Sequence, residues 1–393
     1  MSVCNASLTE SEFDMQNINH HLKTYAKIDH AALEGNYLAI RDYISRETPD
    51  CRIMCVVKAD AYGHGAEGCV KRLASLGVRS YAVSCIEEAR DVAAAAPKES
   101  DILILGYTPA EYAAELSRSG FIQTVYSEEY GRELSREAER AGCDVRVHIK
   151  VDTGMNRIGF IAAHKEACAR SIVAVMDMPH IRTEGIFTHF ACADSGTDEE
   201  TEHQHELFCG VLDAMGERAK GLCVHCCNSA AAMRFSRFRH DMVRVGIILF
   251  GLAPDAEMRL PIGLSPVMTF TTTVIHVHDL HAGDRISYGG TFTADRDMRI
   301  ATLGVGYADG FLRAFSKGGK VLINGTEAPI VGRICMDQCM VDIGENEVHP
   351  GDAAIIFDSE GKNINELAKA ADTICYELVC LVGKRVRRIA AEE

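Results

Sequence analysis

The sequence predicts an α/β protein with a (β/α)8 TIM-type barrel followed by a smaller, mainly β C-terminal domain. Three observations predict this fold class. From residue 28 onward, short apolar runs alternate with amphipathic stretches, eight such runs follow one another, and after residue 266 the rhythm changes to Thr- and Val-rich runs separated by Gly and Asp turns. Strands that alternate with helices indicate a parallel sheet, and eight of them favour a closed barrel over an open doubly wound sheet.

The elements of the barrel begin with a helix. Asp29 is placed to cap it, and apolar residues recur on one helical face at Leu33, Tyr37, Ile40 and Ile44. The eight apolar runs that we expect to form the barrel strands are 53–57, 81–85, 102–105, 121–125, 145–149, 185–188, 222–226 and 242–247. The turn after the first run reads AYGHG rather than GxGxxG, which argues against a dinucleotide-binding fold.

The second domain is expected to consist mostly of strands, at 269–277, 299–305, 320–323, 339–343 and 353–357. One helix interrupts them: Asn363 and Glu366 are spaced as a capping box, and its apolar face comprises Ile364, Leu367 and Ala371. We therefore expect an N-terminal arm at 1–24, the barrel at 25–263 and the β-rich domain at 264–393.

Composition restricts the class of protein. The 393 residues are 47% hydrophobic and 25% charged, which is typical of globular chains. Forty-one Lys and Arg against fifty-six Asp and Glu give a net charge of −15, which argues against a broad nucleic-acid surface or a polybasic membrane patch.

The location is predicted from what the sequence lacks. The N-terminal stretch has no signal-peptide pattern, and the most apolar run, residues 242–254, is interrupted by Arg244. We expect a cytoplasmic protein whose 16 cysteines are reduced thiols. Cys223, Cys226 and Cys227 resemble a metal clip but lack a second ligand pair, so no metal is expected.

Polar residues follow the predicted barrel strands repeatedly. Since function in such barrels collects at the carboxyl ends of the strands, these residues should share one rim. They are Lys58, Lys150, His189, Asn228, Ser229 and Arg244. A single strand-end lysine or histidine usually has a structural role, but their coincidence on one rim favours a site.

Lys58 is the most informative of these residues. It follows an apolar strand, and burial would lower its pKa toward the neutral amine that forms a Schiff base. Arg157 and Arg244 lie in segments that we expect to be packed, where a guanidinium requires acceptors such as a bound anion. Gly246 and Ile247 offer backbone N–H groups where barrels commonly bind phosphate. A lysine beside a phosphate site suggests pyridoxal 5′-phosphate.

Longer motifs carry a family resemblance. In chain order they are VVKADAYGHG, HIKVDTGMNRIGF, EGIFTHFACAD, HCCNSAAAMRF, MVRVGIILFGL, ISYGGTFTA, LGVGYADGF, VGRICMDQCMVDIG and ICYEL. They resemble the alanine racemase family of fold-type-III pyridoxal-phosphate enzymes, from about residue 25 to about residue 388.

The resemblance implies roles at the cofactor. Lys58 would bond to it covalently, Arg157 would donate to its phenolic oxygen, and Arg244 would face its pyridine nitrogen. His189 would pack beside the ring and orient Tyr288. The phosphate would be held by Tyr62, Ser229, Gly246, Ile247 and Tyr376, with Asn228 nearby.

It also implies interconversion of L- and D-alanine, supplying D-alanine for cell-wall peptidoglycan. Racemisation requires an acid/base group on each face of the substrate, which would be Lys58 and Tyr288, the latter from the partner chain of a homodimer. Arg157, Met336 and Asp337 would contact the substrate, and Tyr307 would line the entrance. Lys150 would either be carbamylated and position Arg157, or be an ordinary strand-end lysine.

Three other functions are alternatives to this one. A serine or broad-specificity racemase of the same fold is the nearest alternative. A fold-type-III decarboxylase would carry a carboxylate where Arg244 stands, and a non-catalytic cofactor-holding barrel would lack the second β domain.

Overall fold

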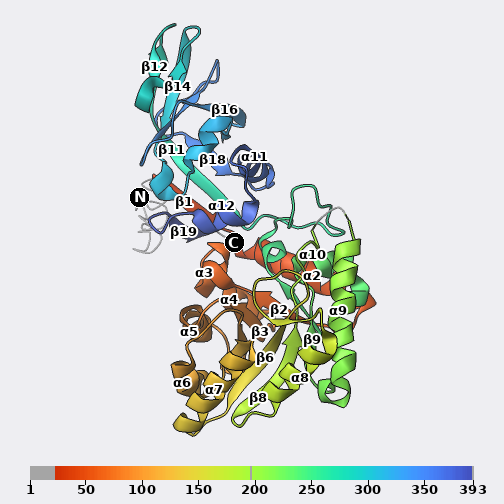
Figure 1. Ribbon diagram of the computed structural model, residues 1–393. Coiled ribbons are helices and arrows are strands. Elements are labelled where there is room, and N and C mark those ends of the chain that lie inside the picture. Colours follow the sequence, from red (N-terminus) through yellow and green to blue (C-terminus); the bar gives the residue numbers. More distant parts are fainter. Residues whose placement is uncertain (1–22, 195–196, 392–393) are drawn as a thin grey trace, which may run out of the picture. The chain divides into compact units, whose positions relative to one another are not determined.

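The computed structural model describes residues 23–194 and 197–391 (Figure 1). The chain forms two compact units. The barrel domain comprises residues 29–267 together with 374–380. The C-terminal domain combines residues 268–373 with segments from both ends of the described chain, 23–28 and 381–391. The predicted N-terminal arm falls almost entirely outside the described residues.

The barrel domain contains the predicted ring of parallel strands. In spatial order they are β10 (Met242–Val245), β2 (Arg52–Val56), β3 (Ser80–Val83), β4 (Asp101–Ile104), β5 (Ile122–Val125), β6 (Val145–Asp152), β8 (Ile181–Phe187) and β9 (Cys223–His225). Two backbone bonds, from Asp241 N to Val224 O and from Arg244 N to Cys227 O, close the ring between β9 and β10. The short β7 (Phe160–Ile161) pairs with β6. The predicted TIM-type barrel is confirmed.

Helices connect these strands around the outside of the ring (Figure 1). They are α2 (His30–Glu47), α3 (Lys58–Tyr62), α4 (Ala66–Ser75), α5 (Ile86–Ala95), α6 (Ala113–Ser119), α7 (Glu128–Ala141), α8 (Lys165–Met176), α9 (Glu199–Met215) and α10 (Ser229–Arg234). The predicted start of α2 is confirmed, because Asp29 accepts a hydrogen bond from Ala32 N at 2.8 Å. All four residues of its predicted apolar face are buried.

The C-terminal domain is mainly antiparallel. Its strands are β1 (Thr24–Ile28), β11 (Met268–Leu280), β12 (Arg285–Ile286), β13 (Phe292–Thr293), β14 (Met298–Leu303), β15 (Lys320–Ile323), β16 (Thr326–Val331), β17 (Cys339–Asp342), β18 (Ala353–Phe357) and β19 (Arg387–Ala390). The long β11 pairs with β1 and β18 through its first half and with β14 through its second half. A register shift between Val274 and His276 separates the two halves.

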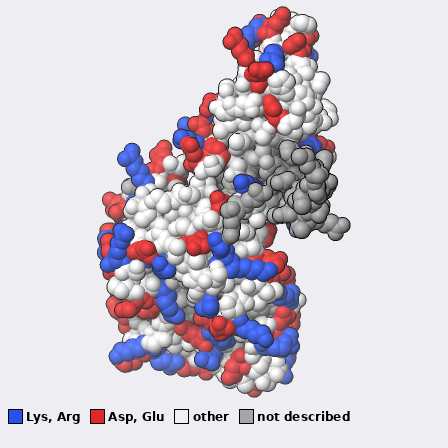
Figure 2. Space-filling view, turned by 180° about the vertical axis from the view of Figure 1, so that it is seen from behind, with Lys and Arg blue, Asp and Glu red and all other residues white. Residues whose placement is uncertain are grey.

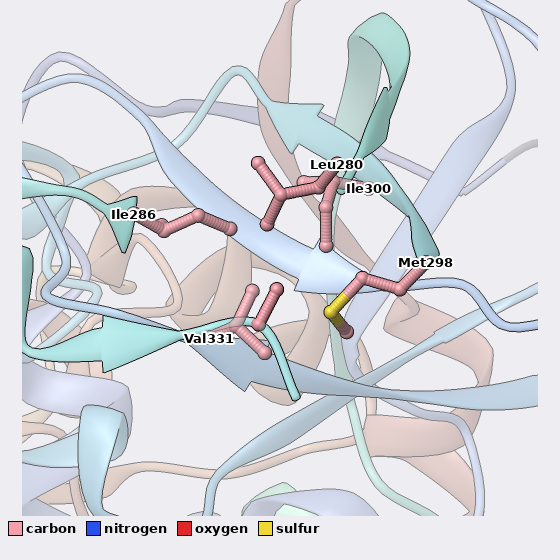
Figure 3. Close-up of a cluster of buried hydrophobic side chains, with 6 residues drawn as sticks. Leu280, Ile286, Met298, Ile300 and Val331 are labelled. Atoms are coloured by element: carbon pink, nitrogen blue, oxygen red, sulfur yellow. The ribbon is translucent and has the colours of Figure 1, made fainter. Parts of the chain in front are cut away.

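Part of this domain is held together by a small apolar cluster. Leu280, Ile286, Met298, Ile300 and Val331 point toward one another from neighbouring strands (Figure 3). Each is at most 8% exposed, so the cluster is removed from water. Burying an aliphatic side chain of this size contributes roughly 1.5–3 kcal/mol, and the cluster fixes the strands that flank the β12–β13 turn.

Strand β1 was not expected from the sequence. Thr24–Ile28 has only five residues, without a strict alternation of polar and apolar side chains, and does not stand out beside the polar arm. It lies between β11, to which it is antiparallel, and β19, to which it is parallel. This first described segment therefore belongs to the C-terminal sheet, whereas α12 (Cys375–Leu381) lies almost wholly in the barrel domain.

The predicted capping box of the late helix is wrong. Helix α11 (Lys362–Ala370) begins after Gly361, and Asn363 lies inside it with its amide donating to Ile356 O at 2.6 Å. The cap is Asp358, which accepts from Lys362 N at 3.1 Å and from Asn363 N at 2.8 Å. A left-handed Gly361, with φ of 72°, lets the chain bring Asp358 beneath the helix.

The surface of the barrel domain carries charged side chains of both signs. On the face shown in Figure 2, acidic and basic side chains are interspersed over the barrel, in the lower part of the view. Within residues 23–194 and 197–391, no helix is long and apolar enough to cross a membrane. All cysteines of these residues are free thiols.

The corrected cap can be tested by two substitutions. Asp358→Ala should lower the free energy of unfolding by about 1 kcal/mol, because two N–H groups of α11 lose their acceptor. Glu366→Gln should change it by less than about 0.5 kcal/mol, since Glu366 only forms a surface ion pair with Lys320. Urea unfolding followed by circular dichroism measures both. A larger loss in Glu366→Gln would restore the capping-box interpretation.

Candidate active site

The carboxyl ends of the barrel strands surround a cavity of about 480 Å³. Ten of the residues singled out from the sequence line it: Lys58, Tyr62, Lys150, Arg157, His189, Asn228, Ser229, Arg244, Gly246 and Tyr376. Ile247 is completely buried at the start of the 3-10 turn Ile247–Phe250 and does not line the cavity. The strand-end rule thus brings together most residues that were predicted for the barrel.

Lys58 lies between strand β2 and the rest of the short α3, which is a left-handed turn rather than a regular α-helix. Ala59, Asp60, Ala61 and Tyr62 all have left-handed backbones, with φ of 52–54°. Each such residue costs roughly 1–2 kcal/mol, so the surrounding structure must hold the turn. Hydrogen bonds from Ala61 N to Val57 O and from Gly65 N to Asp60 O close it. The turn therefore fixes the backbone on both sides of Lys58.

Glu88 of α5 fastens this turn. Its carboxylate accepts from Ala59 N and from Ser84 N, both at 2.7 Å. Burial and the Arg157 charge lower the pKa of Lys58, while Glu88 partly opposes them. Glu88 is thus both the anchor of the lysine turn and an acidic group that acts on its amine.

Arg244 is buried at the centre of the strand ends. Its guanidinium donates to the carbonyl oxygens of Thr188, His225 and Cys226 at 2.7, 3.1 and 3.2 Å. It also donates to Nδ1 of His225 at 2.9 Å and to Nδ1 of His189 at 3.3 Å. Burial lowers the pKa of Arg244 to about 10, so it remains a cation at neutral pH.

These contacts determine the histidine tautomers behind the site. Since an arginine can only donate, Nδ1 of His225 accepts and its proton lies on Nε2. That Nε2 donates to Nδ1 of His148 at 2.9 Å. Burial lowers the pKa of His148 to about 3, so this hydrogen-bonded histidine is neutral. Gly185 makes room for it, because a Cβ there would lie 2.7 Å from the His148 ring.

Lys150 is buried at the end of β6. Its Nζ donates to Val151 O at 2.8 Å and lies 5.6 Å from the centre of the Phe187 ring. Burial and the Arg244 charge lower the pKa of Lys150 to about 7. A sizeable fraction is then a neutral amine at neutral pH, the form that takes up carbon dioxide. This supports the carbamate interpretation, which stays a prediction.

Arg157 differs from the sequence-based expectation. It lines the cavity, but its side chain is exposed rather than packed. The reason is the loop after β6, where Asp152 accepts the backbone N–H groups of Gly154, Asn156 and Arg157. This loop fixes the Arg157 backbone and leaves its guanidinium free to face a ligand.

The opposite wall of the cavity is formed by hydroxyl groups. Ser229 accepts from Gly246 N at 2.9 Å, so this N–H is already engaged while the Ser229 hydroxyl proton remains to be donated. A Cβ on Gly246 would lie 2.3 Å from the Tyr62 hydroxyl, which explains the glycine. The rings of Tyr62 and Tyr376 lie 6.0 Å apart, and burial raises both pKa values, so both phenols are neutral donors. Asn228 caps α10 through Ala231 N.

The charged side chains that line this cavity have one sign. Lys58, Lys150, Arg157 and Arg244 line it, and among the described residues the lining contains no Asp or Glu. A second cavity of about 650 Å³ at the other ends of the strands is different, because there Arg146 lies 2.8 Å from Asp101 and 2.7 Å from Glu184. Of these two cavities, the first is therefore the one suited to an anionic ligand.

The remaining predicted residues lie in the C-terminal domain. Tyr288, Tyr307 and Met336 are 71%, 43% and 53% exposed. Tyr307 N donates to Cys335 O, and Ala308 N donates to Met336 O, both at 3.0 Å, so these two segments lie together. Asp337 forms an ion pair with Arg385 at 2.7 Å. The role assigned to Tyr288 stays a prediction.

Sequence reasoning missed Glu88 and Tyr107. Tyr107 lines the cavity and follows β4, so the strand-end rule could have found it. Glu88 lies in a helix among other acidic residues, and its two backbone contacts have no signal in the sequence. The three cysteines that resemble a metal clip have separate hydrogen-bond partners: Cys226 and Cys227 contact Phe238 O, while Cys223 contacts Arg52.

The fold and the cavity define a barrel enzyme that binds an anionic ligand beside an activated lysine. Family models for the N-terminal and C-terminal domains of alanine racemase match residues 28–254 and 267–390. An alanine racemase of Desulfovibrio desulfuricans is 39% identical over 94% of this chain and 98% of its own length. The chain belongs to the alanine racemase family.

Solved structures agree. An alanine racemase of Clostridium difficile matches with a TM-score of 0.85 and 36% identity, over 94% of this chain and 96% of its own. The alanine racemase of Bacillus anthracis with bound L-Ala-P matches with a TM-score of 0.86 and 32% identity, over 95% and 96% of the two chains.

The anchoring by Glu88 can be tested by hydrogen exchange. In Glu88→Gln only one side-chain oxygen remains, so Ala59 N or Ser84 N loses its acceptor. A hydrogen bond to a charged group contributes about 1.5–3 kcal/mol, so exchange in this turn should accelerate about tenfold or more. Mass spectrometry of a peptide spanning residues 57–65 measures it.

Glu87→Gln is the matched control for this experiment. Glu87 is the neighbouring, exposed residue of α5 and lies 4.0 Å from Arg90. Equal exchange rates in both variants would remove Glu88 from the anchoring of Lys58.

Proposed function

We propose that this protein interconverts L-alanine and D-alanine, as the names of its relatives state for them. The observation that carries the proposal is the amine of Lys58, whose pKa is lowered by burial and by Arg157 in a cavity lined by cations. A neutral amine at such a place can take and return the α-proton of an amino acid. Serine and other amino acids remain alternative substrates of the same site.

The alanine racemase family depends on pyridoxal phosphate, and the cavity fits this cofactor. Its volume of about 480 Å³, its cations and its hydroxyl wall suit an anionic aromatic molecule. When bound, pyridoxal phosphate supplies an electron-poor ring that accepts the electron pair of the breaking Cα–H bond. Lys58 would hold it covalently, and the side chains of Tyr62, Ser229 and Tyr376 would donate to its phosphate.

Arginines would orient the ring and the substrate. The contacts of Arg244 described above use Nη1 and Nη2, so we assign its Nε–H to the ring nitrogen. An arginine donates and cannot protonate that nitrogen, which limits delocalisation of charge into the ring. Arg157, with its exposed guanidinium, would bind the phenolic oxygen and the substrate carboxylate. His189 would pack beside the ring.

We also propose a homodimer in which Tyr288 of one chain faces Lys58 of the other. The exposed Tyr288, Tyr307 and Met336 support this assignment, because large apolar side chains on a surface commonly mark an interface. Tyr288 would act as the second base, Met336 and Asp337 would contact the substrate, and Tyr307 would line the entrance. The cytoplasmic location and the supply of D-alanine for peptidoglycan stay predictions.

The function is tested with purified protein and pyridoxal phosphate. We expect D-alanine to form from L-alanine, and serine and lysine to react at least about tenfold more slowly, since a small pocket discriminates by roughly 1–3 kcal/mol. Lys58→Ala should abolish both directions. Comparable rates for serine would favour the broad-specificity alternative.

The two-base assignment has its own measurement. Tyr288→Phe should slow racemisation in both directions by about 100-fold or more, the usual contribution of an acid/base group. In deuterated water, one enantiomer should still exchange its α-hydrogen without inversion, through Lys58. Tyr112→Phe, at an exposed tyrosine of the barrel, is the control. Exchange and inversion that fall together for both enantiomers would contradict two separate bases.

The shared site is tested by mixing two inactive variants. If Lys58 and Tyr288 of one site come from different chains, a mixed dimer of Lys58→Ala and Tyr288→Phe contains one intact site. Refolding equal amounts together should restore about a quarter of the wild-type activity, given random pairing in a twofold dimer. No recovery, although mass spectrometry shows mixed dimers, would place both bases in the same chain.

A further inference from the structure

A group of potential metal ligands lies on the barrel domain, outside the cavity. His205 and Cys209 are one turn apart on α9, and His240 precedes strand β10. One ligand atom from each residue lies within 4.8 Å of the others. None of the three lines the cavity described above. Histidine and cysteine together are the ligands that Zn²⁺ prefers in proteins.

The distances suit a tetrahedral ion. With Zn–N of about 2.0–2.1 Å and Zn–S of about 2.3 Å, a nitrogen and a sulfur ligand are about 3.6 Å apart and two nitrogens about 3.3 Å. Cys209 Sγ lies 3.6 Å from Nε2 of His205, and the Nε2 atoms of His205 and His240 lie 2.9 Å apart. The two imidazoles would have to separate by about 0.4 Å as their rings turn toward a common ion, and Cys209 Sγ lies within 4.8 Å of a ring nitrogen of His240.

The two imidazoles face one another through these nitrogens. Their ring centres are 5.1 Å apart, so the 2.9 Å contact joins the Nε2 edges, and a single proton lies between them. A metal ion would replace this proton. Burial lowers the pKa of His205 to about 4 and also lowers that of His240, so both are neutral and able to ligate.

The surroundings hold the ligands in place. The His205 ring stacks on Phe238 with centres 3.9 Å apart, and His240 is held at φ of 48°, a left-handed backbone that only local structure can maintain. Arg237, whose charge acts on His205, forms an ion pair with Glu202. Asp213 and Asp241 add negative charge near Cys209 and His240.

We propose that His205, Cys209 and His240 form a binding site for a Zn²⁺-like ion, with the fourth position open to water or an added ligand. The ion would join α9 to the segment that leads into β10. Binding would convert the Cys209 thiol to a thiolate and release one proton to solvent, while the histidine proton moves to a ring nitrogen that faces away from the ion.

The test uses the cofactor-loaded enzyme after removal of metals with a chelator. Isothermal titration with ZnCl₂ should give one tight site per chain, and CoCl₂ should give the visible bands of tetrahedral cobalt with a thiolate charge-transfer band. Cys209→Ser should remove that band and weaken zinc binding at least about 100-fold, because even second-shell changes cost 10–100-fold. His240→Gln should weaken it similarly.

His203→Gln is the matched control, since His203 is an exposed imidazole of the same helix. The proposal is overturned if the wild-type enzyme shows no tight zinc site, or if cobalt gives no thiolate band. It is also overturned if Cys209→Ser and His203→Gln bind zinc equally. Circular dichroism establishes that each variant is folded, and the wild-type cobalt spectrum decides the matter if one is not.

Discussion

The buried guanidinium of Arg244 needs hydrogen-bond acceptors around it. This need determines how the strand ends at the centre of the barrel are arranged. The carbonyl groups that meet it come from the ends of β8 and β9, and the imidazoles of His189 and His225 complete the set. A buried charge that lost these partners would cost several kcal/mol. The carboxyl ends of three adjacent strands are therefore held in one register, and the floor of the cavity follows from it.

The positively charged side chains of the cavity have two effects. Burial and the Arg157 charge lower the pKa of Lys58, and burial and the Arg244 charge lower that of Lys150, so cations that suit an anionic ligand also help to keep nearby amines reactive. Without an anion the cations repel one another, and a bound anion should stabilise the folded barrel by mass action. Glu88 does not line the cavity, but its carboxylate holds the turn next to Lys58 by accepting a hydrogen bond from Ala59 N.

The sequence alone was sufficient to predict features that depend on hydrophobic periodicity or on a residue's position along a strand. The face of α2 and the strand-end placement of Lys150 and Arg244 followed from spacing alone. Features that depend on contacts between distant residues were not predictable. The left-handed turn at 59–62 has no glycine to announce it, because distant hydrogen bonds hold it. The cap of α11 was misplaced for a similar reason: Asp358 reaches it across a left-handed glycine, and local spacing pointed to Asn363.

Neither compact unit is a continuous stretch of chain, and this affects how the protein can fold during translation. Thr24–Ile28 leaves the ribosome early but cannot pair until Met268–Leu280 has been synthesised. Tyr376 reaches the barrel only after most of the second domain has been made. A nascent chain can assemble the eight-stranded ring and still lack Tyr376, one of the hydroxyl groups that line its cavity. The lining of the cavity is thus complete only after α12 has been synthesised.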